Sequence, residues 1–118
     1  MVRYVVAAAL VVAVAASAAA ASAPPVGPLP RGPATAISVP RGELFAVALP
    51  KPARGRVWRI ARAYNANVVT QVSEGVQRGN IVVVYRALRA GRTTLSYALT
   101  LGETSKALQA HTFKVGVG

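Results

Sequence analysis

The sequence has no cysteine, no aspartate, one histidine and only three acidic residues. Without cysteine the chain has no disulfide and no thiolate ligand for a metal. A zinc site needs three or four converging histidine, cysteine or carboxylate ligands, and one histidine with scattered glutamates does not supply them. No G-x-G-x-x-G or P-loop pattern is present to hold a nucleotide. We therefore expect neither a metal nor a cofactor.

The same scarcity argues against catalysis. A serine nucleophile would have to act with His111, the only histidine, and with Glu43, Glu74 or Glu103, which lie far apart in the sequence. No serine stands in a G-x-S-x-G nucleophile elbow. We expect a protein that is not an enzyme, with His111 as an ordinary surface residue.

The longest apolar run is at the N-terminus. Arg3 precedes it, and Ala21-Ser22-Ala23 fits the small-x-small rule of signal peptidase. Residues 1–23 are therefore predicted to be a signal peptide, and the mature chain to be secreted or periplasmic. The alternative, an uncleaved membrane anchor, is disfavoured because the run becomes alanine-rich and falls short of about 20 strongly apolar residues.

Residues 24–33 contain five of the eight prolines and show no apolar periodicity. Because each proline removes a backbone donor, this segment is predicted to be an extended, mostly polyproline II linker. A proline-rich ligand for another module is the alternative, with a spacer favoured outside the cell. The folded domain is predicted to cover residues 34–118.

From residue 34 onward, short β-type runs alternate with turn residues and no segment has a helical period. This pattern predicts an all-β sandwich. Seven strands are expected, over residues 34–39, 43–49, 57–62, 68–72, 81–87, 93–99 and 111–117. Alternation places the following side chains toward the core: Phe45, Val47, Leu49, Trp58, Ile60, Ile81, Val83, Tyr85, Leu95, Tyr97, Leu99, Phe113, Val115 and Val117.

Several motifs follow one another in a recognisable order. The chain reads G-x-x-F-x-V-x-L from Gly42, P-x-x-G-x-x-W from Pro52, Y-x-A-x-x-x-G from Tyr85, L-x-Y from Leu95 and F-x-V-x-V from Phe113. In this series the domain resembles the chagasin-like inhibitors of papain-type cysteine peptidases. The resemblance implies an immunoglobulin-like β-sandwich and a papain-type cysteine peptidase as partner.

The resemblance also implies three peptidase-binding loops that occlude the active-site cleft. The family's first loop, N-P-T-T-G-Y, keeps only its proline and glycine here, and the R-P-W of the third loop is replaced by Leu-Thr-Leu. A missing tryptophan removes a typical interface hot spot. The residues that correspond to the three loops are Lys51, Pro52, Ala53, Arg54, Gly55 and Arg56; Gly75 and Gly79; and Leu99, Thr100 and Leu101.

The charge balance is the strongest feature that the resemblance leaves unexplained. The chain has 14 Lys+Arg against 3 Asp+Glu, a formal net charge of +11. Arginine favours bidentate contact with carboxylate or phosphate, so the alternative function is a basic, non-inhibitory envelope protein that binds anionic polymers or lipid headgroups. No nucleic acid partner is expected, because the chain is predicted to be exported and no aromatic stripe interleaves with the arginines. We expect a monomer.

We predict that the exported protein begins at Pro24, because Ala21-Ser22-Ala23 is the last small-x-small site before the proline-rich segment. Intact-mass measurement of the secreted or periplasmic form tests this. A protein that keeps residues 1–23 and stays in the membrane fraction would contradict the prediction.

Overall fold

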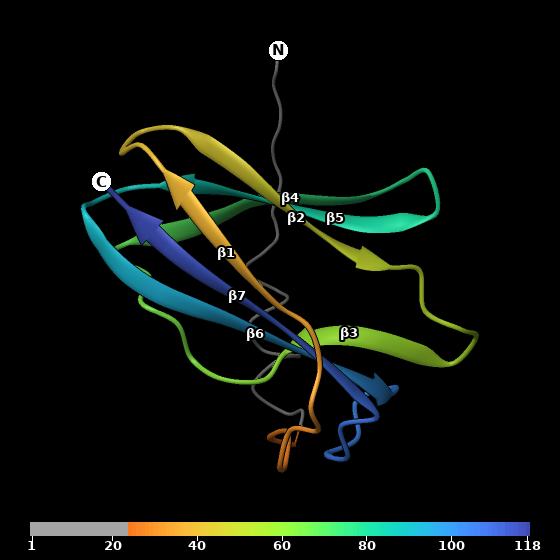
Figure 1. Cartoon of the computed structure of the whole chain (residues 1–118). Helices are drawn as coiled ribbons and strands as arrows, with labels where there is room; N and C mark the ends of the chain where they lie inside the picture. The colour runs from red at the N-terminus through yellow and green to blue at the C-terminus, as the bar shows by residue number, and fades with distance from the viewer. Residues whose placement is uncertain (1–23) are drawn as a thin grey trace.

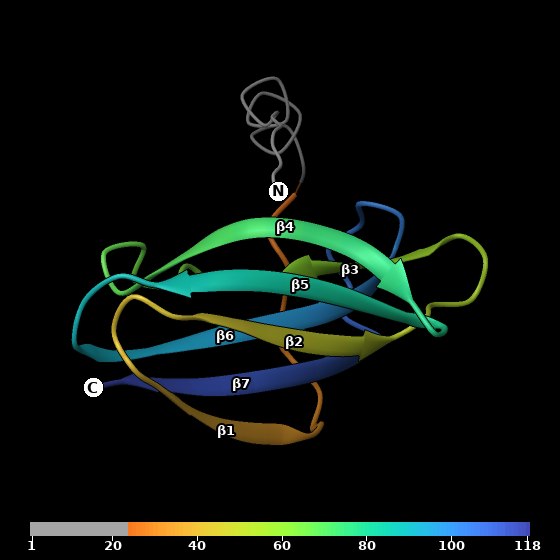
Figure 2. The ribbon, with the colours of Figure 1, turned by 90° about the horizontal axis from the view of Figure 1, so that it is seen from above.

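The computed structural model describes residues 24–118, so the predicted signal segment 1–23 lies outside the described residues. Two sheets face each other, with strand orders β1-β7-β6-β3 and β2-β5-β4 (Figures 1 and 2). β1 pairs with β7 in parallel. The predicted fold, an immunoglobulin-like β-sandwich of seven strands, is confirmed. The strands are β1 (Ala34–Val39), β2 (Leu44–Pro50), β3 (Arg56–Ile60), β4 (Val69–Gln77), β5 (Asn80–Ala87), β6 (Gly91–Leu101) and β7 (Gln109–Val117).

The core lies between the sheets and is built from alternate residues of the strands, as the sequence pattern predicts. Most of the side chains expected to face inward are fully buried there, whereas Phe45, Trp58, Ile60 and Ile81 are partly buried at its margin. Within the described chain, 24–118, no helix is long and apolar enough to cross a membrane.

Strand β4 is longer than the pattern predicts. It continues from residue 72 to Gln77, and a register shift between Gln71 and Ser73 marks a bulge. The second half of β4 carries polar residues and Gly75 and is exposed, so it has no apolar alternation to reveal it. Pairing with β5 extends the strand instead. As expected, β4 lies at the edge of its sheet.

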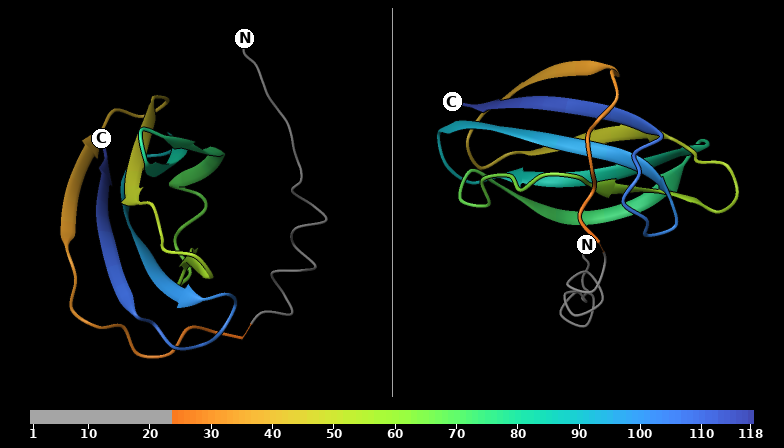
Figure 3. Two further views of the ribbon diagram at one scale, coloured as in Figure 1. Left: turned by 90° about the vertical axis from the view of Figure 1, so that its right-hand side faces the viewer. Right: turned by 90° about the horizontal axis from the view of Figure 1, so that it is seen from below.

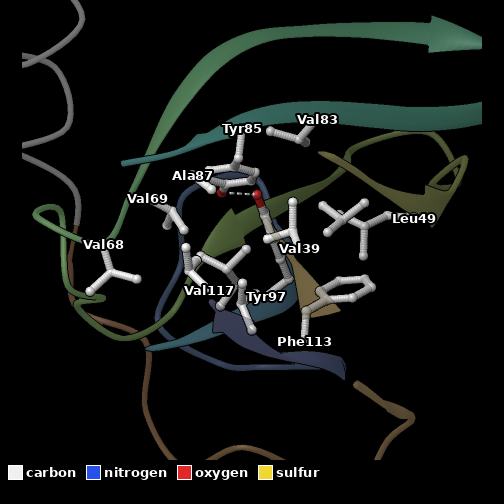
Figure 4. Packing of buried hydrophobic residues seen from close by; sticks show 13 residues of the cluster. Val39, Leu49, Val68, Val69, Val83, Tyr85, Ala87, Tyr97, Phe113 and Val117 are labelled. Atoms are coloured by element: carbon white, nitrogen blue, oxygen red, sulfur yellow. Dashed lines mark hydrogen bonds between the residues drawn. The ribbon is translucent and has the colours of Figure 1, made fainter. Parts of the chain in front are cut away.

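Two buried tyrosines join the sheets across the core. Tyr85 on β5 is 0% exposed, Tyr97 on β6 is 4% exposed, and their hydroxyl oxygens are 2.6 Å apart (Figure 4). The ring of Phe45 stacks on Tyr85 at 5.5 Å between centroids, and Phe113 meets Tyr97 edge to face at 6.1 Å. One hydroxyl therefore donates to the other, which gives each buried phenol a hydrogen-bond partner.

Residues 24–33, called here the strap, are extended and contain no strand, but they do not stand away from the domain. The strap crosses the outer face of the four-stranded sheet (Figure 3). Val26 is buried, the Gly27 amide donates to the Ser105 carbonyl at 2.7 Å, and the Thr112 amide donates to the Pro33 carbonyl at 2.9 Å. The segment expected as a spacer is packed onto the sandwich.

Two arginines bind the N-terminal end of the strap: Arg59 lies in β3, and Arg62 lies just after it. The Arg59 guanidinium donates to the Pro24 carbonyl at 2.6 Å and to the Thr104 carbonyl at 2.8 Å. Arg62 donates to the carbonyls of Val26 and Gly27 at 3.1 and 3.0 Å. A proline-rich segment has few donors but keeps its carbonyls, which explains why arginine is the suitable partner.

Small residues allow the strap to approach closely. Ser96, Ala98 and Ala110 point away from the core yet are buried, and a Cβ atom on Gly32 would lie 1.8 Å from the Ala110 carbonyl oxygen. Only glycine fits at this crossing. These three residues are small and buried although they lie on the outer face of the sheet, and the strap crosses closely over Ala110.

We predict that the tyrosine pair makes the protein sensitive to alkali. Burial raises the pKa of Tyr97 to about 12 and raises that of Tyr85 further. In the unfolded chain both phenols ionise near pH 10, so the unfolded state loses protons first and the free energy of unfolding falls as pH rises from about 10 to about 12. Denaturant unfolding monitored across this pH range should show the loss.

The matched variant is Tyr85→Phe with Tyr97→Phe, which removes these two titrating groups and should reduce the pH dependence. Burial also raises the pKa of Tyr64, which remains in this variant and keeps part of the effect. The single variant Tyr97→Phe leaves the Tyr85 hydroxyl buried without its partner and should cost about 1–3 kcal/mol. Phenolate absorbance showing that all tyrosines of the folded wild type ionise near pH 10 would contradict the assignment.

Candidate functional site

Three loops gather at one end of the sandwich, beside each other in Figures 1 and 2. The first loop (residues 51–55) joins β2 to β3, the second (residues 78–79) joins β4 to β5, and the third (residues 102–108) joins β6 to β7. The Lys51 amide donates to the Gly79 carbonyl at 3.1 Å, and the Gly102 amide donates to the Gly55 carbonyl at 2.9 Å. The first loop is thus bonded to both of the others.

The first loop has a turn of fixed shape. The Arg56 amide donates to the Ala53 carbonyl at 3.1 Å and closes the turn, in which Gly55 has a φ of 81°. This φ is in the left-handed region that favours glycine. A Cβ atom on Gly55 would meet nothing within 4 Å, so the requirement for glycine comes from the backbone alone. Ala53 and Arg54 are exposed at the tip.

Trp58 fixes the start of the first loop. Its indole Nε1 donates to the Pro50 carbonyl at 2.8 Å, and the ring packs partly buried against the core. The expected inward position is confirmed, with an added polar contact that alternation does not reveal. Pro50 ends β2 and Trp58 lies in β3, so this bond ties together the two strands that flank the loop.

The second loop is shorter than the sequence suggests. The glycine-rich stretch 74–79 was expected to form it, but Gly75 lies within β4, paired with Val82 of β5. Only Arg78 and Gly79 remain in the turn, with φ values of 53° and 77°. Two successive positive φ angles are typical of a type I′ hairpin turn. Gly75 is a strand residue because β4 continues along β5, so this expectation is corrected.

The third loop also begins later than expected. Leu99, Thr100 and Leu101 lie in β6, paired with residues of β3 that include Arg56 and Trp58. Leu99 is 4% exposed and Thr100 is 0% exposed, so neither faces a partner, whereas Leu101 is 52% exposed at the loop's edge. The placement of all three in a loop is corrected, because pairing with β3 prolongs the strand.

The residues that follow β6 form the loop that the sequence reading missed. It begins at Gly102, which has a φ of 54°, and continues through a run of polar residues. This run of polar residues after an apolar strand is the feature of the sequence that could have predicted the loop. The loop is held at its base by the Leu108 amide, which donates to the Leu99 carbonyl at 2.7 Å.

The loop end is strongly basic. Its cations are exposed and outnumber the single loop carboxylate, Glu103. Arg62 is not one of them, because it binds the strap. A surface of one sign attracts an acidic partner and repels a basic one. The cations of the loop end are Lys51, Arg54, Arg56, Arg78 and Lys106.

The described residues contain no cluster of side chains suited to a metal ion. Residues 24–118 contain no group of three or more His, Cys, Asp or Glu side chains that could hold a metal ion. His111 lies in β7, where its ring stacks on Phe113 at 4.3 Å, and burial lowers its pKa. Its nearest polar side chain is Thr35, 3.4 Å from Nε2.

Comparison with solved structures places this geometry among known folds. The cysteine protease inhibitor EhICP2 from Entamoeba histolytica has a similar structure, with a TM-score of 0.57 and 13% sequence identity. The match covers 75% of this chain and 99% of that chain. No family model matches the sequence, and comparison with curated proteins finds no relative. This protein therefore shares its fold with a cysteine protease inhibitor.

We predict that Trp58→Ala lowers the free energy of unfolding by about 3 kcal/mol, the low end for loss of a core aromatic because Trp58 is only partly buried. Trp58→Phe keeps most of the packing but loses the bond to Pro50, and should cost about 1 kcal/mol. Denaturant unfolding measures both. Equal stability of Trp58→Ala and wild type would show that the ring does not support the loop.

Proposed function

We propose that the mature chain is an exported inhibitor of papain-type cysteine peptidases, in which the first, second and third loops occlude the active-site cleft. The observation that carries this proposal is the first loop itself, a fixed turn hydrogen-bonded on each side to a neighbouring loop. The fold shared with a cysteine protease inhibitor supports the same assignment.

The loop geometry suits inhibition without turnover. A peptidase cleaves a segment that adopts an extended conformation, whereas the first loop is closed by the bond from Arg56 to Ala53 and anchored to Gly79 and Gly102. A turn held in its bound shape before association loses little conformational entropy on binding. The first loop would enter the cleft, with the other two loops contacting its rims.

The basic side chains define which peptidases would be bound. Arg54 at the loop tip must either keep its hydration or meet an acidic group, since an unpaired buried charge is costly. Leu101 offers an exposed apolar side chain beside the third loop, but with less area than an aromatic ring. We therefore expect selectivity for peptidases with acidic cleft walls and moderate affinity.

We predict that the mature protein inhibits papain-type peptidases at about micromolar concentration and that Gly55→Val abolishes inhibition, because a β-branched residue is disfavoured at the positive φ. The control is Gly55→Asn, which tolerates this φ and has free space, and should retain inhibition. Inhibition constants measured on a panel of peptidases with acidic and neutral clefts provide the test.

A third variant tests the charge at the tip of the first loop. Arg54→Thr removes the charge that must be desolvated and should strengthen inhibition of peptidases with neutral clefts while weakening that of acidic ones. Failure of the folded wild type to inhibit any member of the panel would overturn the proposed function. Equal inhibition by wild type and Gly55→Val would show that the first loop does not enter the cleft.

A further inference from the structure

The outer face of the four-stranded sheet has a half that the strap does not cover. Strands β1, β6 and β7 form a shallow groove of about 410 Å³ there, toward the end of the sandwich opposite the three loops. It continues into a second hollow of about 710 Å³, with which it shares Ser38, Arg92 and Gly116. The groove is independent of the proposed inhibitory surface.

Strand register places the residues of this groove in two neighbouring rows. Lys114 of β7 lies between Ala36 of β1 and Thr94 of β6. Two positions along, Gly116 lies between Ser38 and Arg92. All these side chains point away from the core because Val115 and Val117 alternate with them and are buried.

Two cations therefore lie next to Gly116, which has no side chain: Arg92 is its partner on β6, and Lys114 is two positions away on β7. Arg92 and Lys114 are diagonal neighbours on adjacent antiparallel strands, so their Cβ atoms are less than about 8 Å apart. Both are exposed, and the side chains that line the groove include no carboxylate. Gly116 leaves a hollow between Arg92 and Ser38, where an anionic group would meet both cations and the hydroxyls of Ser38 and Thr94.

We propose that this groove binds an acidic polysaccharide, a linear polymer that carries carboxylate or sulfate groups. Arginine and lysine next to each other in a groove without carboxylate side chains suit repeated anionic groups, with bidentate contact from Arg92. The groove continues into the second hollow, which leaves room for more than one unit of a polymer.

The groove's chemistry disfavours other anionic partners. Its outward side chains are small or charged, and none is a large apolar residue of the kind that enters the acyl region of a membrane. It also contains no aromatic ring on which a nucleic acid base could stack. A hydrophilic polymer that binds through its charges fits the small and charged side chains of the groove.

The experiment measures binding of the mature protein to heparin, as a sulfated polysaccharide probe, at moderate salt. Arg92→Ala with Lys114→Ala should weaken binding about tenfold or more, since two charge-assisted contacts are lost. The matched control, Arg54→Ala with Arg78→Ala, removes the same charge from the loop end and should weaken binding less than about twofold, through long-range attraction alone. Thermal unfolding checks that each variant is folded.

A charge-neutral variant tests the shape of the groove. A Cβ atom on Gly116 would lie 4.0 Å from the Ile37 carbonyl oxygen, so Gly116→Val fits the strand yet fills the hollow and should also weaken heparin binding. Equal weakening by the groove and loop double variants would overturn the proposal in favour of general electrostatic attraction. Absence of heparin binding together with binding to phosphatidylglycerol vesicles would overturn it in favour of a lipid surface.

Discussion

The hydrogen bond between the hydroxyls of Tyr85 and Tyr97 is the constraint on which the arrangement of this sandwich depends. The chain has no cysteine, so the two sheets are joined without any disulfide. Apolar packing is tolerant of small shifts, whereas a buried pair of hydroxyls is satisfied in only one alignment of the sheets. β5 and β6 carry the pair, and their alignment sets where the connected loops meet.

The loop end shows what this alignment brings together. β2, β4 and β6 all run toward it, so three connections from two sheets come together and exchange backbone hydrogen bonds. The backbone features of the first loop, its closed turn and the positive φ of Gly55, depend on these bonds and on the contact from Trp58 to Pro50. Its charge comes from Lys51 and Arg54, which take no part in these hydrogen bonds through their side chains. Shape and charge are therefore separable properties of this surface.

The strap divides the outer face of the four-stranded sheet into a covered half and an uncovered half. Arg59 and Arg62 bind its carbonyls, and Gly32 lets it cross β7 closely. The covered half has small buried residues, and the uncovered half keeps exposed cations on either side of Gly116. The basic residues of the chain thus lie in different places: some bind the strap, some surround the loops, and two are neighbours in the groove.

The sequence by itself determined the fold class, the order of the strands along the chain and the inward residues, because alternation of apolar side chains and the positions of proline and glycine are local signals. Only the tertiary structure decided where β4 and β6 end, because Gly75 and Thr100 are held in strands by pairing with β5 and β3, which no local pattern records. The same holds for the strap, whose prolines indicate an extended chain but not the sheet it covers, since that depends on arginines and small residues distant in sequence.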